Sequence, residues 1–286
     1  MINDRLPICL PTEVNAFVSS EERSQLEAQL ENYFRAYVVG EKYFIKVGTS
    51  EKDCFFQSLK REVKTYKMFH LSSIRCPKLV WHYIGDDIVV LVTEKIPGSP
   101  LADRREAFHL PPNVLVENLL PDIAKIRKVE TPPHWVSSYH RDEKVQKYCK
   151  ILHSHLPARL RTALESLVGH LHTQNNIGFS HGDLLPKNIL FYHEHYWFID
   201  WEWADLRPYS YDPALFALFS LDPLLGLTCF EKWSQFWNPI ELYRDAVVIA
   251  LREMKIWLTQ ATNKTERVKY AALWQRTLEE AIRWLM

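Results

Sequence analysis

Short runs of β-forming residues stand in pairs near the start of this chain. Residues 35–48, RAYVVGEKYFIKVG, have two such runs on either side of Gly40, and residues 79–96, LVWHYIGDDIVVLVTEKI, have two around Gly85. Paired β-rich runs separated by a short glycine-containing turn are typical of a β-hairpin. We therefore predict two hairpins in the first hundred residues.

Helical spacing surrounds these hairpins. Residues 19–34 start with Ser and an acidic first turn, and residues 51–71 place Phe55, Leu59, Val63 and Tyr66 on one helical stripe. The pattern is almost entirely helical from 112 to 175, and a short β segment at 188–204 precedes a long helical tail. This order predicts an α+β fold.

The stretch Pro97-Gly98-Ser99-Pro100 breaks the pattern and marks the predicted junction between two parts. We expect a small β-rich N-terminal lobe at 1–96, which binds nucleotide. A large, mainly helical C-terminal lobe at 97–286 would carry out catalysis and bind the acceptor. A cleft between such lobes is a natural place for a ligand.

Composition narrows the class of protein. Of 286 residues, 47% are hydrophobic and 24% are charged, and the formal net charge is zero. This balance is ordinary for a soluble globular protein and gives no reason to expect nucleic acid or an anionic membrane as a partner. The apolar runs are too short to span a bilayer, and residues 1–15 lack the basic start and apolar run of a signal peptide. We expect a cytoplasmic protein without membrane insertion.

The cysteines support this location. They are scattered and never form a CxxC pair, so they are predicted to be reduced core thiols instead of disulfides or zinc ligands. The five are Cys9, Cys54, Cys76, Cys149 and Cys229.

Residues 180–190, SHGDLLPKNIL, carry the candidate chemistry. Asp183 and Asn188 are five residues apart, and Asp200 follows a predicted hairpin turn at 193–195. That hairpin would bring Asn188 and Asp200 to the same end, where an amide oxygen and a carboxylate suit Mg²⁺. Asp183 could then orient or deprotonate a hydroxyl beside the ion. The alternative is that Asp183 and Asn188 only cap a turn.

A lysine in the predicted sheet adds to this picture. Lys46 ends the run FIK, and Glu62 lies on the next predicted helix. A buried lysine needs a partner, which Glu62 can supply. Kinases hold ATP phosphates with such a Lys-Glu pair. The alternative is a solvated lysine at a strand end, with Glu41 or Glu51 nearby.

Together these segments resemble the aminoglycoside phosphotransferase and choline kinase superfamily, relatives of protein kinases that phosphorylate small molecules. The resemblance is carried by His181-Gly182-Asp183 through Asn188, FIDWEWA at 198–204, and Tyr211-Asp212-Pro213-Ala214. TEKIPGSPL at 93–101 resembles the hinge between the lobes, and the matches run in the expected order over most of 36–220. The resemblance implies a protein-kinase-like two-lobe fold and an ATP- and Mg²⁺-dependent enzyme.

The resemblance also implies a role for each matched residue. Asp183 would be the catalytic base, Asn188 and Asp200 would hold Mg²⁺, and Lys46 would contact the α and β phosphates while it pairs with Glu62. The backbone of Glu94 and Ile96 would meet the adenine. His181 would brace the catalytic loop, and Asp212 would support it from the following helix.

Two departures from the family pattern stand out. The chain has no glycine before Gly40, and residues 28–31 occupy the positions of the glycine-containing loop that covers the phosphates in these enzymes. Arg35 is the candidate to replace its backbone amides, with a solvent-facing arginine as the alternative. Leu185 stands where protein kinases that act on Ser or Thr carry a lysine, which favours a small-molecule acceptor.

The acceptor is predicted from tryptophans near carboxylates. Trp201 and Trp203 flank Glu202, and Trp233 and Trp237 follow near Asp222 and Glu231. Aromatic faces with carboxylates suit a cationic hydroxyl compound such as choline, ethanolamine, thiamine or an amino sugar. The alternative is that these tryptophans pack helices, as we expect for Trp257 and Trp284. A peptide or protein hydroxyl, and a non-catalytic binding protein that keeps the cleft, remain as rival functions.

Overall fold

The fold is described from a computed structural model, which covers residues 10–286 except 70–71, 109–118, 134, 138 and 172–175. The chain forms two compact units: residues 1–99 with 190–204, and residues 100–189 with 205–286. The sequence analysis assigned 190–204 to the C-terminal lobe. The segment instead packs in the first unit, where the ring centroids of Trp201 and Phe69 lie 4.4 Å apart and Phe198 N–H donates to Arg75 O at 2.9 Å.

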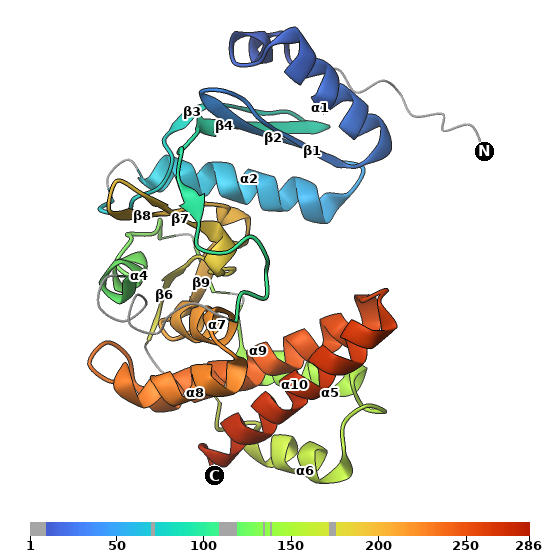
Figure 1. The fold of residues 1–286 in the computed structure, drawn as a ribbon, viewed down its shortest axis with the longest axis vertical. Coiled ribbons are helices and arrows are strands. Elements are labelled where there is room, and N and C mark those ends of the chain that lie inside the picture. The colour runs from blue at the N-terminus through green and yellow to red at the C-terminus, as the bar shows by residue number, and fades with distance from the viewer. Residues whose placement is uncertain (1–9, 70–71, 109–118, 134, 138, 172–175) are drawn as a thin grey trace, which may run out of the picture. The chain divides into compact units, whose positions relative to one another are not determined.

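An antiparallel sheet is the centre of the first unit. Its strands lie in the order β1 (Arg35–Val39), β2 (Tyr43–Thr49), β4 (Ile88–Glu94) and β3 (Leu79–Ile84). Both predicted hairpins are present. Figure 1 shows α1 (Ser20–Asn32) and α2 (Asp53–Met68) on opposite faces of this sheet.

The two helices follow from their sequence signals. Ser19 and Glu22 form a reciprocal capping box at the start of α1. In α2 the buried stripe contains Leu59, Val63 and Tyr66 as predicted, but Phe56 is buried in place of Phe55, which is half-buried. The helical period of the hydrophobic residues does not by itself decide which of two adjacent phenylalanines at the edge of the buried stripe becomes buried.

A third hairpin, outside the four-stranded sheet, lies near the C-terminal end of the first unit. β7 (Ile189–Tyr192) and β8 (His195–Phe198) are neighbouring strands, and the short helix η5 (Trp201–Trp203) follows. The turn consists of His193 and Glu194 alone, both with positive φ, as a two-residue hairpin turn requires. His195, which the sequence analysis placed in the turn, is the first residue of β8. The remaining short elements are η1 (Thr12–Ala16) and β5 (Ser99–Pro100).

The second unit is mainly helical. Its longest helices, α9 (Pro239–Gln260) and α10 (Lys264–Arg283), pack against each other, and α7 (Tyr211–Ser220) is buried along its whole length. The other elements are α4 (Leu120–Ile126), α5 (Arg141–Ile151), α6 (Ala158–Leu167), α8 (Pro223–Lys232), the short helix η4 (Pro186–Asn188) and the strand pair β6 (Ile177–Ser180) and β9 (Asp205–Pro208).

The helical prediction for 112–175 is wrong between α4 and α5. The described residues of 127–140 form no helix, because Pro132 and Pro133 cannot continue one. The parts of that prediction at 112–118 and 172–175 lie outside the described residues.

Several aromatic and cysteine predictions need correction. Trp201, Trp233 and Trp237 are buried, whereas Trp284 is 50% exposed because it stacks on Tyr243 with one face at the end of α10. Trp257 is half-buried.

Among the cysteines, Cys229 is buried and Cys54 is exposed on the polar side of α2, so Cys54 is not a core thiol. Cys9 lies outside the described residues. No helix in the described part of the chain is both long and apolar enough to cross a bilayer.

Candidate active site

The loop that follows β6 is fixed by one carboxylate. Asp212, in the first turn of α7, accepts hydrogen bonds from His181 N–H at 2.7 Å, Gly182 N–H at 2.9 Å and Ser180 Oγ at 2.9 Å. Gly182 has φ +79°, a conformation that a residue with a Cβ adopts only with strain. The sequence HGD therefore folds as a tight, anchored turn that ends at Asp183.

Asp183 has a defined surrounding. Asn188 Nδ2 donates to the Asp183 backbone oxygen at 2.8 Å and lies 3.4 Å from its Oδ2. The Asp183 N–H lies 3.3 Å from His181 Nδ1. Its carboxylate is 13% exposed, so it is oriented by the loop yet open to solvent on one side. Such a carboxylate can accept a proton from a hydroxyl.

Arginines that the sequence analysis missed lie beside Asp183. Arg105 Nη1 is 3.6 Å from Asp183 Oδ1, and Arg105 and Arg252 share Glu253 Oε1 at 2.7 and 2.9 Å. Arg252 also donates to Tyr211 Oη at 2.9 Å. No local sequence pattern marks these arginines, because their partners are distant in the chain.

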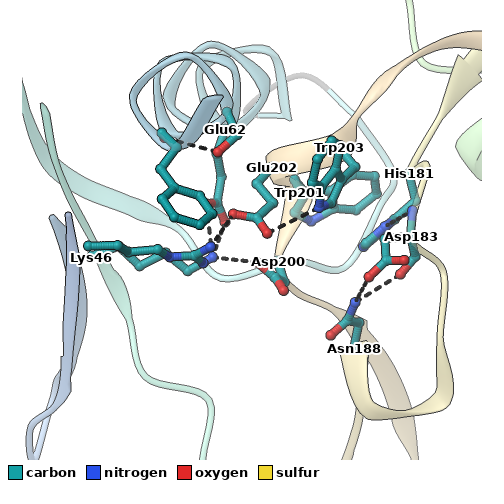
Figure 2. A network of polar contacts seen from close by, with 12 residues as sticks. Lys46, Glu62, His181, Asp183, Asn188, Asp200, Trp201, Glu202 and Trp203 are labelled. Atoms are coloured by element: carbon teal, nitrogen blue, oxygen red, sulfur yellow. Dashed lines mark hydrogen bonds and ion pairs between the residues drawn. The ribbon is translucent and has the colours of Figure 1, made fainter. Parts of the chain in front are cut away.

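Lys46 forms the centre of a second cluster, in the first unit (Figure 2). Its Nζ is 2.9 Å from both Glu62 oxygens and 2.5 Å from Asp200 Oδ1. The predicted Lys46–Glu62 ion pair is therefore present, and its side chains are almost fully buried. Burial lowers the pKa of Lys46, but Glu62 and Asp200 outweigh it and the net shift is upward. Burial raises the pKa of Glu62 to about 7 despite the opposing effect of Lys46.

Glu202 joins this cluster, although the sequence analysis considered it only in the argument for a cationic acceptor. Its Oε2 is 2.8 Å from Arg35 Nη1, and its Oε1 accepts from Trp203 Nε1 at 3.1 Å (Figure 2). Arg35 thus faces a carboxylate and not only solvent. Carboxylate oxygens of Glu62, Asp200 and Glu202 lie within 4.8 Å of one another, a spacing that a metal ion could use. The sequence signals for Glu202 are its place two residues after Asp200 and the tryptophans on either side of it, and neither predicts its pairing with Arg35.

The predicted adenine contacts lie at the end of β4, at Glu94, and just after it, at Ile96. Glu94 N–H donates to Lys78 O at 2.9 Å, and Lys95 N–H donates to Lys42 O at 2.9 Å. Within the described residues, no hydrogen-bond partner is found for Ile96 N–H. The Ile96 amide is therefore able to donate to a ligand.

The predicted metal ligands belong to different units. Asn188 lies in the second unit and Asp200 in the first, so their joint coordination of one ion stays a prediction. The chemistry of each fits a hard cation. Asn188 uses its amide nitrogen on Asp183, which directs its oxygen elsewhere, and Asp200 is a carboxylate held by Lys46.

A fold with a small antiparallel sheet, a buried Lys-Glu pair and an anchored HGD loop defines a kinase-like phosphotransferase. The model of the phosphotransferase enzyme family matches residues 22–243, and this chain belongs to that family. The comparison with curated protein sequences finds no match.

Solved structures agree on the fold. The chain is similar to the ADP-bound aminoglycoside phosphotransferase APH(2'')-Ib, with 17% identity, a TM-score of 0.58, and coverage of 93% of this chain and 99% of that one. A thermostable APH(4)-Ia in ternary complex with AMP-PNP and hygromycin B gives 13% identity, a TM-score of 0.60 and coverage of 93% and 98%. Choline kinase LicA from Streptococcus pneumoniae has 14% identity to this chain and a TM-score of 0.58, with coverage of 93% of this chain and 100% of that one. The predicted superfamily and α+β kinase-like fold are confirmed.

Proposed function

We propose that this protein transfers the γ-phosphoryl group of ATP to a hydroxyl group of a small molecule. The observation that carries the proposal is the HGD loop, in which Asp212 anchors the backbone and Asn188 holds Asp183. Family membership supports phosphotransfer to a small molecule, and the relatives solved with ADP and AMP-PNP support the use of ATP.

Asp183 is the base in this proposal. The acceptor oxygen attacks the γ-phosphorus, the bond from that phosphorus to the β,γ-bridging oxygen breaks, and ADP leaves. The hydroxyl proton passes to the Asp183 carboxylate. Catalysis of this kind depends mostly on positioning and on charge stabilisation, since little covalent chemistry is left to the protein.

The nucleotide is held by residues of the first unit. Lys46, kept charged by Glu62 and Asp200, binds the α and β phosphates, and the Glu94 carbonyl and Ile96 N–H meet the adenine. Asn188 and Asp200 would hold Mg²⁺, which when bound offsets the negative charge of the phosphates. We place the reaction in the cytoplasm, where ATP is supplied and exposed thiols such as Cys54 stay reduced.

The acceptor is a small hydroxyl compound. The tryptophan argument for a cationic acceptor is weakened, because Trp201, Trp233 and Trp237 are buried in packing and Trp203 is the half-exposed member of the set. The arginines beside Asp183 add positive charge there. Nothing in the comparisons supports a peptide acceptor. A panel must therefore contain both cationic hydroxyl compounds, including choline, ethanolamine, thiamine and amino sugars, and anionic ones.

The test combines binding and turnover. Mg²⁺-dependent stabilisation by ATP in a thermal shift assay should identify the nucleotide, and ATP consumption with mass spectrometry of the product should identify the acceptor. Asp183→Asn in parallel gives the background rate. Nucleotide binding without turnover on any acceptor would favour a non-catalytic binding protein, and absence of nucleotide binding would reject both.

A further inference from the structure

A pocket of about 740 Å³ opens at the edge of the sheet in the first unit. It lies where the chain passes from α1 into β1, opposite the start of α2. Its lining consists of Gln29, Asn32, Tyr33, Phe34, Arg35, Tyr37, Lys52 and Phe55. All of these residues belong to one compact unit, so the pocket does not depend on the second unit.

Strand register places two residues of this pocket on the same face of the sheet as Lys46. Tyr37 is the direct cross-strand partner of Lys46, and residues opposite each other in an antiparallel pair share a face. Arg35 lies two residues before Tyr37 and therefore on that face, opposite Gly48. The alternate residues Ala36 and Val38 are buried on the other face, in the core with α1. Arg35 and Tyr37 of the pocket thus share one side of the sheet with Lys46.

The charged side chains that line the pocket are cations. Lys52 Nζ lies 5.8 Å from the Phe34 ring centroid and 5.0 Å from that of Phe55, and the Arg35 guanidinium lies 5.9 Å from Phe55. No carboxylate lines the pocket, and Lys52 has no ion-pair partner in the described part of the chain. An aromatic-walled pocket with two cations, of which Lys52 has no ion-pair partner among the described residues, favours an anionic ligand.

Arg35 is held in place for such a ligand. One ion pair, from Nη1 to Glu202 Oε2 at 2.8 Å, uses part of its guanidinium. A guanidinium carries five N–H donors, so Nε and Nη2 remain able to bind phosphate oxygens. Glu202 is therefore a positioning residue for Arg35.

The local structure explains why this chain needs side-chain donors. Residues 28–31, which the resemblance in the sequence analysis matches to the glycine-containing loop, lie in the last turns of α1. The Gln29 side chain bonds both the N–H and the carbonyl of Tyr37 at 3.1 Å and so covers the free edge of β1. Helical backbone amides are used within the helix and cannot cradle a phosphate there. Phosphate binding must come from other groups.

We propose that this pocket binds the terminal phosphates of the nucleotide, with Arg35 and Lys52 in place of a glycine-rich loop. This inference rests on the proposed function, because it assumes that ATP is the donor. Arg35 binds through its free guanidinium edge, and Lys52 acts as a point charge beside Phe34 and Phe55.

Calorimetry of the whole chain tests the proposal. The ligands are ATP, AMP and adenosine, and the variants are Lys52→Gln, Lys52→Arg and the control Lys64→Gln, which changes an exposed lysine of the same helix outside the pocket. We expect Lys52→Gln to weaken ATP binding about tenfold, the usual value of a charged hydrogen bond, and to leave adenosine and AMP unchanged. Lys52→Arg should retain most of the affinity, and Lys64→Gln should match the parent.

Arg35 and Glu202 provide the second arm. Arg35→Gln should weaken ATP binding without effect on adenosine, and Glu202→Gln, which removes the charge but keeps an acceptor, should weaken it less. In turnover assays both should raise the KM for ATP more than they lower kcat. Thermal unfolding confirms that each variant is folded.

The outcomes separate the two proposals. ATP binding by the parent with unchanged affinity in Lys52→Gln and Arg35→Gln would overturn this inference and leave the proposed function intact. No ATP binding by the parent would overturn the proposed function itself. Pyrophosphate is a further probe: if it binds the pocket while the protein is saturated with ATP, the pocket serves a separate anion and the inference is wrong.

Discussion

Asp212→Ala is expected to damage both stability and turnover through a single loop. The Asp212 carboxylate is 5% exposed and accepts from two backbone N–H groups and one hydroxyl. Each buried donor left without a partner costs about 1–3 kcal/mol, so the loss is about 3–6 kcal/mol when water replaces part of the network. For a unit of this size we expect Tm to fall by roughly 10 °C. Turnover should fall about 100-fold, because Asp183 loses its fixed position.

Differential scanning calorimetry and steady-state kinetics on the same preparations give both values. Asp222→Ala is the matched control, since Asp222 caps α8 with one hydrogen bond to Leu224 N–H at 3.0 Å. That loss costs about 1 kcal/mol and should leave turnover near the parent value. If Asp212→Ala were no less stable than Asp222→Ala, or kept full turnover, the anchoring of the loop by Asp212 would be refuted.

Three further results are expected. Asp245→Ala removes the fully buried carboxylate that pairs with Arg141 at 2.7 Å and should lower the free energy of unfolding by about 3–5 kcal/mol in urea, whereas a loss below about 1 kcal/mol would contradict this. Exposed Cys54 should react with a thiol reagent in the native protein. Cys76 should not, because burial raises its pKa to about 12 and so keeps the thiol protonated even at pH 9; equal rates would argue against that burial. Asp200→Ala should abolish the Mg²⁺-dependent part of ATP affinity, and an unchanged dependence would place the ion elsewhere.

Local patterns predicted the elements that depend on local signals. The hairpins at Gly40 and Gly85 follow from paired β runs and short turns, and α1 follows from the Ser19 cap and its acidic first turn. The helical prediction across Pro132 failed because periodicity was given more weight than a proline break.

Contacts between distant segments were predicted only where a motif supplied both partners. Lys46 and Glu62 were paired because they match a known order of residues, and the structure contains that pair. The ion pair of Arg35 with Glu202 joins residues 167 positions apart (202 − 35) that no local rule links. Partners of this kind depend on how the elements pack, which neither hydrophobic period nor turn chemistry determines.

The measurement that tests the central claim most directly is transfer of the terminal phosphoryl group from ATP to a hydroxyl compound, in the parent and in Asp183→Asn. The account predicts a phosphorylated product with the parent. It predicts a rate lower by about two to four orders of magnitude in the variant, with ATP affinity retained, since that is the usual contribution of a positioned base. Turnover in Asp183→Asn within a few fold of the parent would contradict the assignment of Asp183, and ATP binding without transfer to any acceptor would contradict the assignment of the protein as a kinase.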